Sequence, residues 1–517
     1  MQLEFDNRFV NELPGDSTGA LQSRQTPDVC WSAAHPTQVS KPALLTYSRE
    51  VAELLDLPEE HIRSDAFLAA FSGNRLLPGM NPYAARYGGH QFGSWAGQLG
   101  DGRAISLGEA INSQGQRWEL QLKGAGITPY SRRADGRAVL RSSLREFLCS
   151  EAMHHLGIPT TRALSLIATG EPVMRDMLYD GNPEMEPGAI VCRVSKSFIR
   201  FGNFEILASY GERDLLNRLV AFTMDRDFPE IDKLSSDRFS IWFRTVCERT
   251  ARLIVEWLRV GFVHGVMNTD NMSILGITID YGPYGWVDNF DPGWTPNTTD
   301  ADWHRYALAR QPSIARWNLE RLADAMEAVA PSRSVLDEGL AHFDHVFESA
   351  LSSMLAAKFG LLQIRNEDAS LFEDAFELLH KANVDMTEFF RSLADVKRNA
   401  PDLAVLKSAF YDASLYRDHE KTFTAWLNRY AARLSQQQRS DEERRLAMNA
   451  VNPRFVLRNY LAQQAIDAAT KNDMSVLERL MDAARHPYDE GIPPDLTAKR
   501  PDWAIDKPGC SMLSCSS

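Results

Sequence analysis

The first third of the chain alternates hydrophobic and polar residues over short stretches, a pattern typical of strands. The clearest stretch covers residues 118–123, in which Trp118, Leu120 and Leu122 alternate with polar residues. This period of two predicts a strand with those three side chains on one face and Lys123 on the polar face at its end. For an isolated lysine, a solvated position at the edge of a sheet is the ordinary alternative.

After this strand the hydrophobic period becomes helical. The spacing predicts a helix from about Ala138 to His155, ended by Gly157 and Pro159. Further helical patterns cover residues 48–55, 238–260, 319–329 and 335–358. Strands followed by a long helical part predict an α+β protein.

Changes in pattern divide the chain into five stretches. We expect an N-terminal flank (1–80), a β-rich lobe (81–185), a helical lobe (186–311), a helical extension (312–486) and an extended tail (487–517) with Cys510 and Cys515. A polar, proline-containing loop near residue 183 marks the boundary between the two lobes.

Residues 264–282 carry the most informative chemistry. Residues 272–275 and 277–279 are apolar and β-favouring with one glycine between them, so we expect a hairpin. Antiparallel pairing would bring Asn271 and Asp280 side by side. A carboxamide oxygen and a carboxylate together form a site that suits Mg²⁺ or Mn²⁺. For this segment alone, a surface hairpin whose Asn and Asp cap turns is an equally good interpretation.

The loop before this hairpin lacks the usual base of a protein kinase. Kinases build their metal site from the Asn of the catalytic loop and the Asp of Asp-Phe-Gly, and here Asp280 opens the triplet Asp-Tyr-Gly. The kinase base stands five residues before that Asn, but five residues before Asn271 stands Val266, which cannot accept a proton. Asp270 is the only carboxylate left in the loop. The chain is therefore either a kinase-like protein that only binds nucleotide or an enzyme with a displaced base.

A glycine-rich stretch between residues 87 and 109 precedes the strand. Within it, Gly100, Gly102 and Arg103 lie in a predicted tight turn whose backbone N–H groups and guanidinium could meet phosphates. Without a lysine at a fixed spacing, this stretch is not a Walker P-loop, and alone it is a weak signal.

A kinase-like role for Lys123 requires a glutamate on the helix at 138–155. Glu151 falls within an apolar stripe that includes Leu144 and Leu148, where a carboxylate is costly unless it is paired. Glu146 lies on a different face of the helix. Periodicity does not choose between the two.

Composition excludes several classes of protein. A formal net charge of −13 over 517 residues argues against a general nucleic-acid binder. Residues 1–7 have neither a basic nor an apolar segment of a secretion signal, and no apolar run approaches the ~20 residues that span a membrane. Six cysteines are too few for a disulfide scaffold in so long a chain. We expect a soluble, cytoplasmic protein with no membrane or nucleic-acid partner.

Five motifs form a specific combination: Lys123–Gly126, Tyr130–Arg132, Asp135–Arg141, His264–Asn271 and Cys515–Ser517. Together they closely resemble the selenoprotein O family, which includes bacterial YdiU-type protein adenylyltransferases, over nearly the whole chain. The resemblance implies a two-lobed, protein-kinase-like fold with terminal extensions, which binds ATP in a flipped orientation. It implies transfer of AMP to Ser, Thr or Tyr hydroxyls of proteins with Mg²⁺ or Mn²⁺. Bacterial members have also been linked with UMP transfer in the presence of Mn²⁺, which would make UTP a second nucleotide.

The resemblance also assigns roles to individual residues. Nucleotide contacts fall on Gly100, Gly102, Arg103, Lys123, Asp135, Gly136, Arg193, Arg200 and Asp280. The proton acceptor matches Asp270, the metal ligands match Asn271 and Asp280, and the helix glutamate matches Glu146 by its spacing from Lys123. A surface arginine is the ordinary alternative for Arg193 and for Arg200.

The tail carries a redox expectation that rests on the same resemblance. Animal members have selenocysteine at the place of Cys515, and some bacterial members are thought to tie this cysteine to one just after the segment matching residues 288–293. This chain has no cysteine at 294–296, so that bond cannot form here. The resemblance favours a labile disulfide between Cys515 and another thiol, Cys510 included. A disordered tail with reduced cysteines is the ordinary alternative.

Two functions therefore remain open from the sequence. The first is a metal-dependent nucleotidyltransferase that acts on protein hydroxyls. The second is a catalytically silent, nucleotide-binding pseudokinase that regulates a partner. Conventional phosphoryl transfer is a weaker third, because Val266 stands where the base would be.

Overall fold

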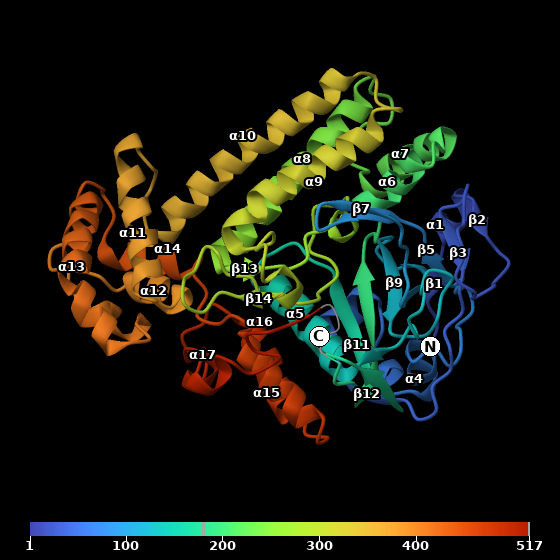
Figure 1. Cartoon of the computed structure of the whole chain (residues 1–517), viewed down its shortest axis with the longest axis horizontal. Helices are drawn as coiled ribbons and strands as arrows, with labels where there is room; N and C mark the ends of the chain where they lie inside the picture. The colour runs from blue at the N-terminus through green and yellow to red at the C-terminus, as the bar shows by residue number, and fades with distance from the viewer. Residues whose placement is uncertain (178, 180, 515–517) are drawn as a thin grey trace.

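The structure, a computed structural model, describes residues 1–177, 179 and 181–514 and shows the α+β protein that the sequence predicts. Figure 1 shows most of the strands gathered at one end of the molecule. Long helices run from this end toward a group of helices at the opposite end.

In the described part of the chain, ten strands form one mixed sheet in the order β2-β3-β5-β8-β9-β12-β11-β4, with β1 beside β8 and β10 beside β12. Their bounds are β1 Glu4–Phe5, β2 Gly15–Asp16, β3 Trp31–Ala33, β4 Ala43–Tyr47, β5 Tyr83–Ala85, β8 Ala104–Ile111, β9 Arg117–Lys123, β10 Ala138–Val139, β11 Arg162–Arg175 and β12 Glu184–Ser195. Strand β9 lies between β8 and β12, where Lys123 stands opposite Ala104 and Val191. The lysine therefore ends a central strand.

Two short pairs of strands lie outside this sheet. One is the hairpin β6 (Gly88–Gln91) and β7 (Ser94–Gln98), and the other joins β13 (Phe262–Val263) to β14 (Gly285–Trp286). The second pair brackets the segment 264–284, so both ends of that segment are held together.

The helices are α1 Arg8–Glu12, α2 Arg49–Leu54, α3 Glu59–Ile62, α4 Asp65–Phe71, α5 Leu140–His155, α6 Phe201–Ser209, α7 Arg213–Asp227, α8 Arg238–Val260, α9 Gln311–Met326, α10 Arg333–Lys358, α11 Ala369–Lys381, α12 Met386–Leu393, α13 Ala413–Ser435, α14 Asp441–Asn449, α15 Asn459–Ala469, α16 Ser475–Arg485 and α17 Pro494–Thr497. Helix α5 packs against β11 and β12, and α15 and α16 pack on α5. One cluster of buried hydrophobic residues includes members from Phe9 to Cys510 along the sequence. The C-terminal part of the chain returns to the sheet.

Several predicted elements are confirmed. The strand at 118–123 is β9, and the helix at 238–260 is α8 with the same bounds. The helix expected from Ala138 begins two residues later, because Ala138 and Val139 pair with β12 as strand β10. The polar-face position of Lys123 does not mean exposure, since the residue is only 7% exposed.

The predicted hairpin at 272–279 is wrong. Ser273 makes a bridge with Arg200, whereas Thr278 makes a bridge with Thr160, so the two halves pair with different neighbours. Ile274 and Ile279 are buried, which explains why both halves are apolar without forming strands. The tertiary contacts of these residues override their β propensity.

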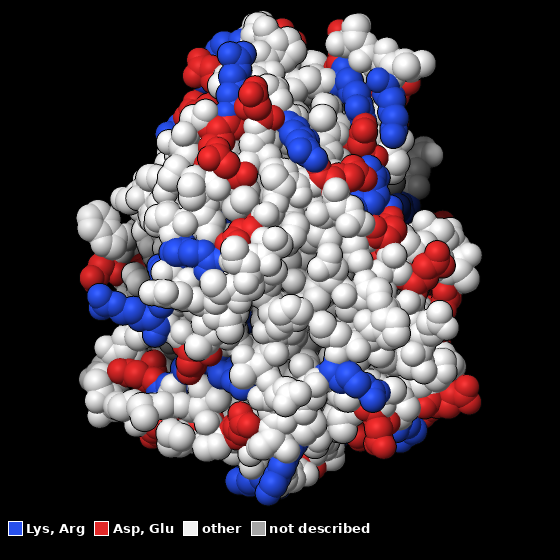
Figure 2. Space-filling model, turned by 90° about the vertical axis from the view of Figure 1, so that its right-hand side faces the viewer, with Lys and Arg blue, Asp and Glu red and all other residues white. Residues whose placement is uncertain are grey.

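The charged side chains can be followed on one face of the molecule. On the face shown in Figure 2, basic and acidic side chains are interspersed over a mostly uncharged surface. Among the described helices, none combines the length and the apolar character that crossing a bilayer requires.

Candidate functional site

A cavity of about 640 Å³ opens between the sheet and the segment that follows α8. Of the residues assigned to nucleotide or metal binding from the sequence, those on its wall are Gly100, Gly102, Arg103, Lys123, Asp135, Gly136, Arg193, Asn271 and Asp280. Cavities of 300–1,000 Å³ are typical of small-ligand sites. Residues distant in sequence thus meet at one site, although the hairpin expected to join Asn271 and Asp280 does not exist.

The charge of this wall is its most distinctive property. Six arginines and one lysine line the cavity against three aspartates, whereas the whole chain has a net charge of −13. The arginines are Arg103, Arg132, Arg133, Arg137, Arg175 and Arg193. Guanidinium groups pair well with phosphate oxygens. The cavity therefore suits a polyanionic ligand.

The structure pairs Lys123 with Glu146 in a buried ion pair between β9 and α5. Glu146 also accepts a hydrogen bond from Arg193 at 3.2 Å. Burial lowers the pKa of Lys123, and the Glu146 carboxylate partly opposes this. The lysine is thus held at the cavity by a partner from the helix.

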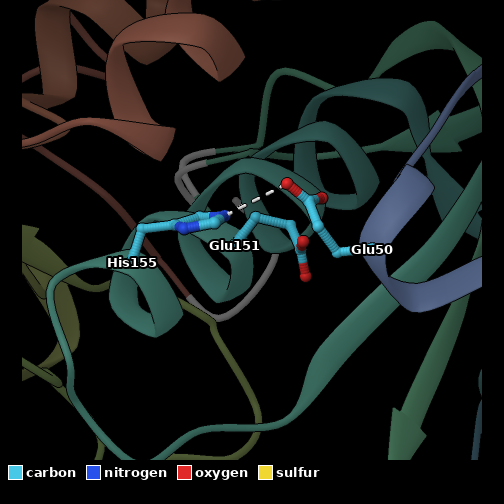
Figure 3. Close-up of side chains that lie close together, drawn as sticks. All are labelled: Glu50, Glu151 and His155. Atoms are coloured by element: carbon cyan, nitrogen blue, oxygen red, sulfur yellow. Dashed lines mark ion pairs between the residues drawn. The ribbon is translucent and has the colours of Figure 1, made fainter. Parts of the chain in front are cut away.

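Glu151, the other candidate partner, is engaged elsewhere. Its carboxylate accepts two hydrogen bonds from Arg162, at 2.8 and 2.7 Å, and one from Ser48 at 2.7 Å. Figure 3 shows Glu151 beside His155 and Glu50, and the latter two form an ion pair at 3.8 Å. These three side chains bring ligand atoms within 4.8 Å of one another. Arg162 already neutralises Glu151, so ion pairing accounts for the cluster.

Asp280, on the cavity wall, is paired with two arginines. Arg193 pairs with its Oδ1 and Arg200 with its Oδ2. Burial alone would raise its pKa, but the charges of Arg200, Arg193 and Lys123 outweigh burial and hold the pKa well below its usual range. Asp280 also has a left-handed backbone, with φ at 55°. The carboxylate is therefore charged and fixed in position.

Asn271 and Asp280 fit the divalent cation that the family resemblance implies. The Asn271 Nδ2 atom donates to the Val266 carbonyl at 2.9 Å, so the amide oxygen is the atom left for another partner. Each carboxylate oxygen of Asp280 binds one guanidinium and retains lone-pair capacity. Both residues line the cavity, and oxygen donors suit Mg²⁺ or Mn²⁺.

Asp270 faces a different side of the loop and does not line the cavity. Hairpin β6–β7 covers it, with Gln91 Nε2 donating to Oδ2 at 3.2 Å, while Oδ1 is buried and has no hydrogen-bond partner. Burial raises the pKa of Asp270 to about 7. Arg200 also lies behind the wall, where it donates to the Asp270 carbonyl at 2.8 Å and pairs with Asp280. Arg200 thus connects the backbone of Asp270 to the carboxylate of Asp280.

Sequence reasoning missed several residues of the site. Gln121 accepts a hydrogen bond from Arg193, and it shares the polar face of β9 with Lys123, so the period of two could have found it. No sequence signal pointed to Gln91. Tyr130 packs where a Cβ on Gly100 would lie, at 2.4 Å, which explains why the turn contains glycine.

The described part of the tail reaches the loop near the site. Leu513 makes a backbone bridge with Asn297, whose side chain donates to the Gly265 carbonyl at 3.0 Å. Cys510 is buried, and burial raises the pKa of its thiol to about 11. Cys515 lies outside the described residues, so its disulfide stays a prediction.

Comparisons with known proteins agree with this geometry. A family model described as "Protein adenylyltransferase SelO" matches residues 20–485. A protein of Methylobacillus flagellatus named "Protein nucleotidyltransferase YdiU" is 62% identical over the full length of both chains. Proteins of the same name from Aromatoleum aromaticum and Tolumonas auensis are each 59% identical over all of this chain and 99% of theirs. The chain therefore belongs to the protein adenylyltransferase SelO family and is a protein nucleotidyltransferase.

Proposed function

We propose that this enzyme transfers AMP from ATP to Ser, Thr or Tyr hydroxyls of proteins, on a two-lobed scaffold like that of a protein kinase. The observation that carries the proposal is the cationic cavity in which the Lys123–Glu146 ion pair, Asn271 and Asp280 meet. These are the groups with which kinases hold a metal-bound nucleotide. Val266, on the same wall, stands where a kinase has its base.

The lobes would be the β-rich part, residues 81–185, and the helical part, residues 186–311. Lys123 comes from a central strand of the sheet and Glu146 from the helix packed on that sheet, as in a kinase. Residues 1–80 and 312–486 would be the terminal extensions, with 487–517 as the tail.

The proposed reaction is a displacement at the α-phosphorus. The hydroxyl oxygen of the protein substrate attacks this atom, and the bond to the bridging oxygen of the β-phosphate breaks. AMP stays on the hydroxyl oxygen, pyrophosphate leaves, and the hydroxyl proton passes to Asp270. Lys123, Arg103 and Arg193 stabilise the charge that develops on the phosphates, which is commonly the largest contribution to such catalysis.

A divalent cation would be held by Asn271 and Asp280. When bound, it would polarise phosphate oxygens and neutralise part of their charge. Arg200 and Arg193 keep Asp280 ionised and oriented for this task. UMP transfer from UTP belongs to the same proposal, because UTP carries the same triphosphate as ATP.

Labelled ATP tests the proposal directly. The protein is incubated with ATP labelled at the α- or at the γ-phosphate, with Mg²⁺ or Mn²⁺, and the protein-bound label is measured. Label from the α position alone supports AMP transfer. Label from the γ position alone would instead indicate phosphorylation, and no incorporation from either would favour the nucleotide-binding pseudokinase.

A further inference from the structure

The two reactants must reach this site from different sides. Asn271 and Asp280 line the nucleotide cavity, but Asp270 does not, and its side chain lies under hairpin β6–β7. A Cβ on Gly89 would lie 2.5 Å from Asp270 Oδ1, so the backbone of the hairpin rests directly on the carboxylate. A hydroxyl that approaches Asp270 must therefore pass along this hairpin.

The tip of the hairpin is anchored to the catalytic loop. The His90 backbone N–H donates to Thr269 Oγ1 at 2.7 Å. The Phe92 N–H donates to Asn268 Oδ1 at 3.2 Å and to the Tyr306 hydroxyl at 3.0 Å. These bonds fix the side chains of the tip next to Asp270.

The anchored tip presents aromatic side chains to solvent. Phe92 is 36% exposed and Trp95 is 38% exposed. The ring of His90 lies 5.1 Å from that of Trp95 and 5.5 Å from that of Trp317 on α9, which runs beside β7 in Figure 1. Exposed aromatic side chains held in place by neighbouring rings are typical of surfaces that bind proteins. We call His90, Phe92, Trp95, Arg305 and Trp317 the tip surface.

Arg305 gives the tip surface an unmatched positive charge. Its guanidinium lies 4.8 Å from the ring of Trp317, and its Nε atom is buried without a hydrogen-bond partner. Across the described chain, no carboxylate forms an ion pair with Arg305. Arg321 lies over the same ring at 5.0 Å, but it pairs with Asp324 at 2.9 Å. Only one of the two arginines on Trp317 is therefore left to bind an acidic group from outside.

We propose that the tip surface docks the protein substrate, as a segment with an acidic side chain close to the modified hydroxyl and an apolar side chain against Phe92 and Trp95. Arg305 would pair with the acidic group while the hydroxyl reaches Asp270. This inference rests on the proposed function, and it adds the chemistry by which the acceptor is selected.

The test uses two peptides of equal length, each with one Tyr, flanked by Glu in one peptide and by Lys in the other. Matched pairs with Ser or Thr in place of Tyr extend it. Transfer of label from α-labelled ATP is measured as kcat and KM for each peptide. We expect the Glu peptide to be preferred by roughly two- to fivefold in kcat/KM, as for a partly exposed charge pair. The difference should lie in the peptide KM, with the KM for ATP unchanged.

Three variants separate docking from a structural role. Arg305→Glu should reverse the preference to the Lys peptide, whereas Arg321→Glu should keep the preference for Glu. Trp95→Ala should raise the KM of both peptides equally. Thermal melting checks that each variant is folded. Since lost packing cannot reverse a charge preference, reversal supports docking on Arg305.

Different results would overturn the docking role and the proposed function. Equal use of both peptides by the wild-type enzyme, or an unchanged preference in Arg305→Glu, would overturn docking at the tip surface while AMP transfer stands. Absence of α-label on every peptide and on the enzyme itself would overturn the proposed function and, with it, the docking role.

Discussion

Asp280 and Asp270 lie ten residues apart, the first half-buried and the second buried, and their environments drive their pKa values in opposite directions. Asp280 meets two guanidinium groups, which hold its pKa well below the usual range. Asp270 receives one hydrogen bond from Gln91, and burial raises its pKa to about 7. Carboxyl groups separated in this way commonly divide the work of a site. Asp280 is suited to remain ionised, whereas Asp270 is suited to accept and release a proton.

The first prediction concerns Asp270. Asp270→Asn keeps the shape of the side chain but cannot accept a proton from the hydroxyl. We expect turnover to fall by about 10²–10⁴, as is usual on loss of a general base. ATP binding should be unchanged because Asp270 does not line the cavity. Steady-state kinetics and ATP binding to the same preparation measure both effects, and full turnover in Asp270→Asn would rule out the displaced base.

The second prediction contrasts the two glutamates of α5. Glu146→Gln removes the partner of Lys123, so we expect weaker ATP binding and lower turnover. Glu151→Gln breaks a buried pair with Arg162 outside the cavity, which typically costs about 3–5 kcal/mol of folding free energy. It should therefore lower the melting temperature with little effect on ATP affinity. Calorimetry and ATP titration distinguish the two, and a loss of ATP affinity confined to Glu151→Gln would contradict the assignment.

At the scale of elements, the sequence predicted regular structure well where apolar residues occupy one face and polar residues the other. Strand β9 and helix α8 follow from their hydrophobic periods. Helix α5 is buried on every side from Leu140 to Met153, so no polar face remained to distinguish Glu146 from Glu151. The hairpin at 272–279 was wrong because its apolar residues pack against distant segments. Contacts of this kind have no local signature in one sequence.

The third prediction concerns the contact between hairpin β6–β7 and helix α6. A Cβ on Gly202 of α6 would lie 2.1 Å from the Gly88 carbonyl, so Gly202→Ala should push the hairpin away from Asp270. We expect lower stability and at least a tenfold loss of turnover, as is reasonable for a misplaced catalytic group. Gly491→Ala is the control, because a Cβ added there would have no neighbouring atom within 4 Å. Normal kinetics in Gly202→Ala would mean that the hairpin does not position Asp270.

At the scale of the whole molecule, segments from early and late in the chain share one core, and the tail reaches the neighbourhood of the site. The core joins Phe9 to Cys510, and the tail reaches the loop at 296–298. The Leu513 N–H donates to the Pro296 carbonyl at 3.1 Å, and the Thr298 N–H donates to the Leu513 carbonyl at 2.8 Å. The sequence indicated an extended tail but could not indicate where it docks, because backbone pairing of this kind does not depend on residue type.

The fourth prediction follows from this docking. Deleting residues 509–517 removes both backbone bonds and uncovers the loop that holds Gly265 through Asn297. We expect a lower melting temperature and a several-fold loss of turnover, with ATP still bound. Leu513→Asp, which places a charge at a fully buried position, should reproduce the defect. If the shortened chain keeps full turnover and stability, the tail plays no part in supporting the site.

If the cavity directs attack to the α-phosphorus of ATP, pyrophosphate must leave, and the fifth prediction concerns this leaving group. Pyrophosphate release and protein-bound AMP are measured in one reaction, for the wild-type enzyme and for Asp280→Ala, with and without excess chelator. We expect one pyrophosphate to be released for each AMP bound, and both products to be lost in Asp280→Ala and in the presence of chelator. Release of ADP together with phosphorylated protein would contradict this expectation, as would AMP transfer that persists in Asp280→Ala.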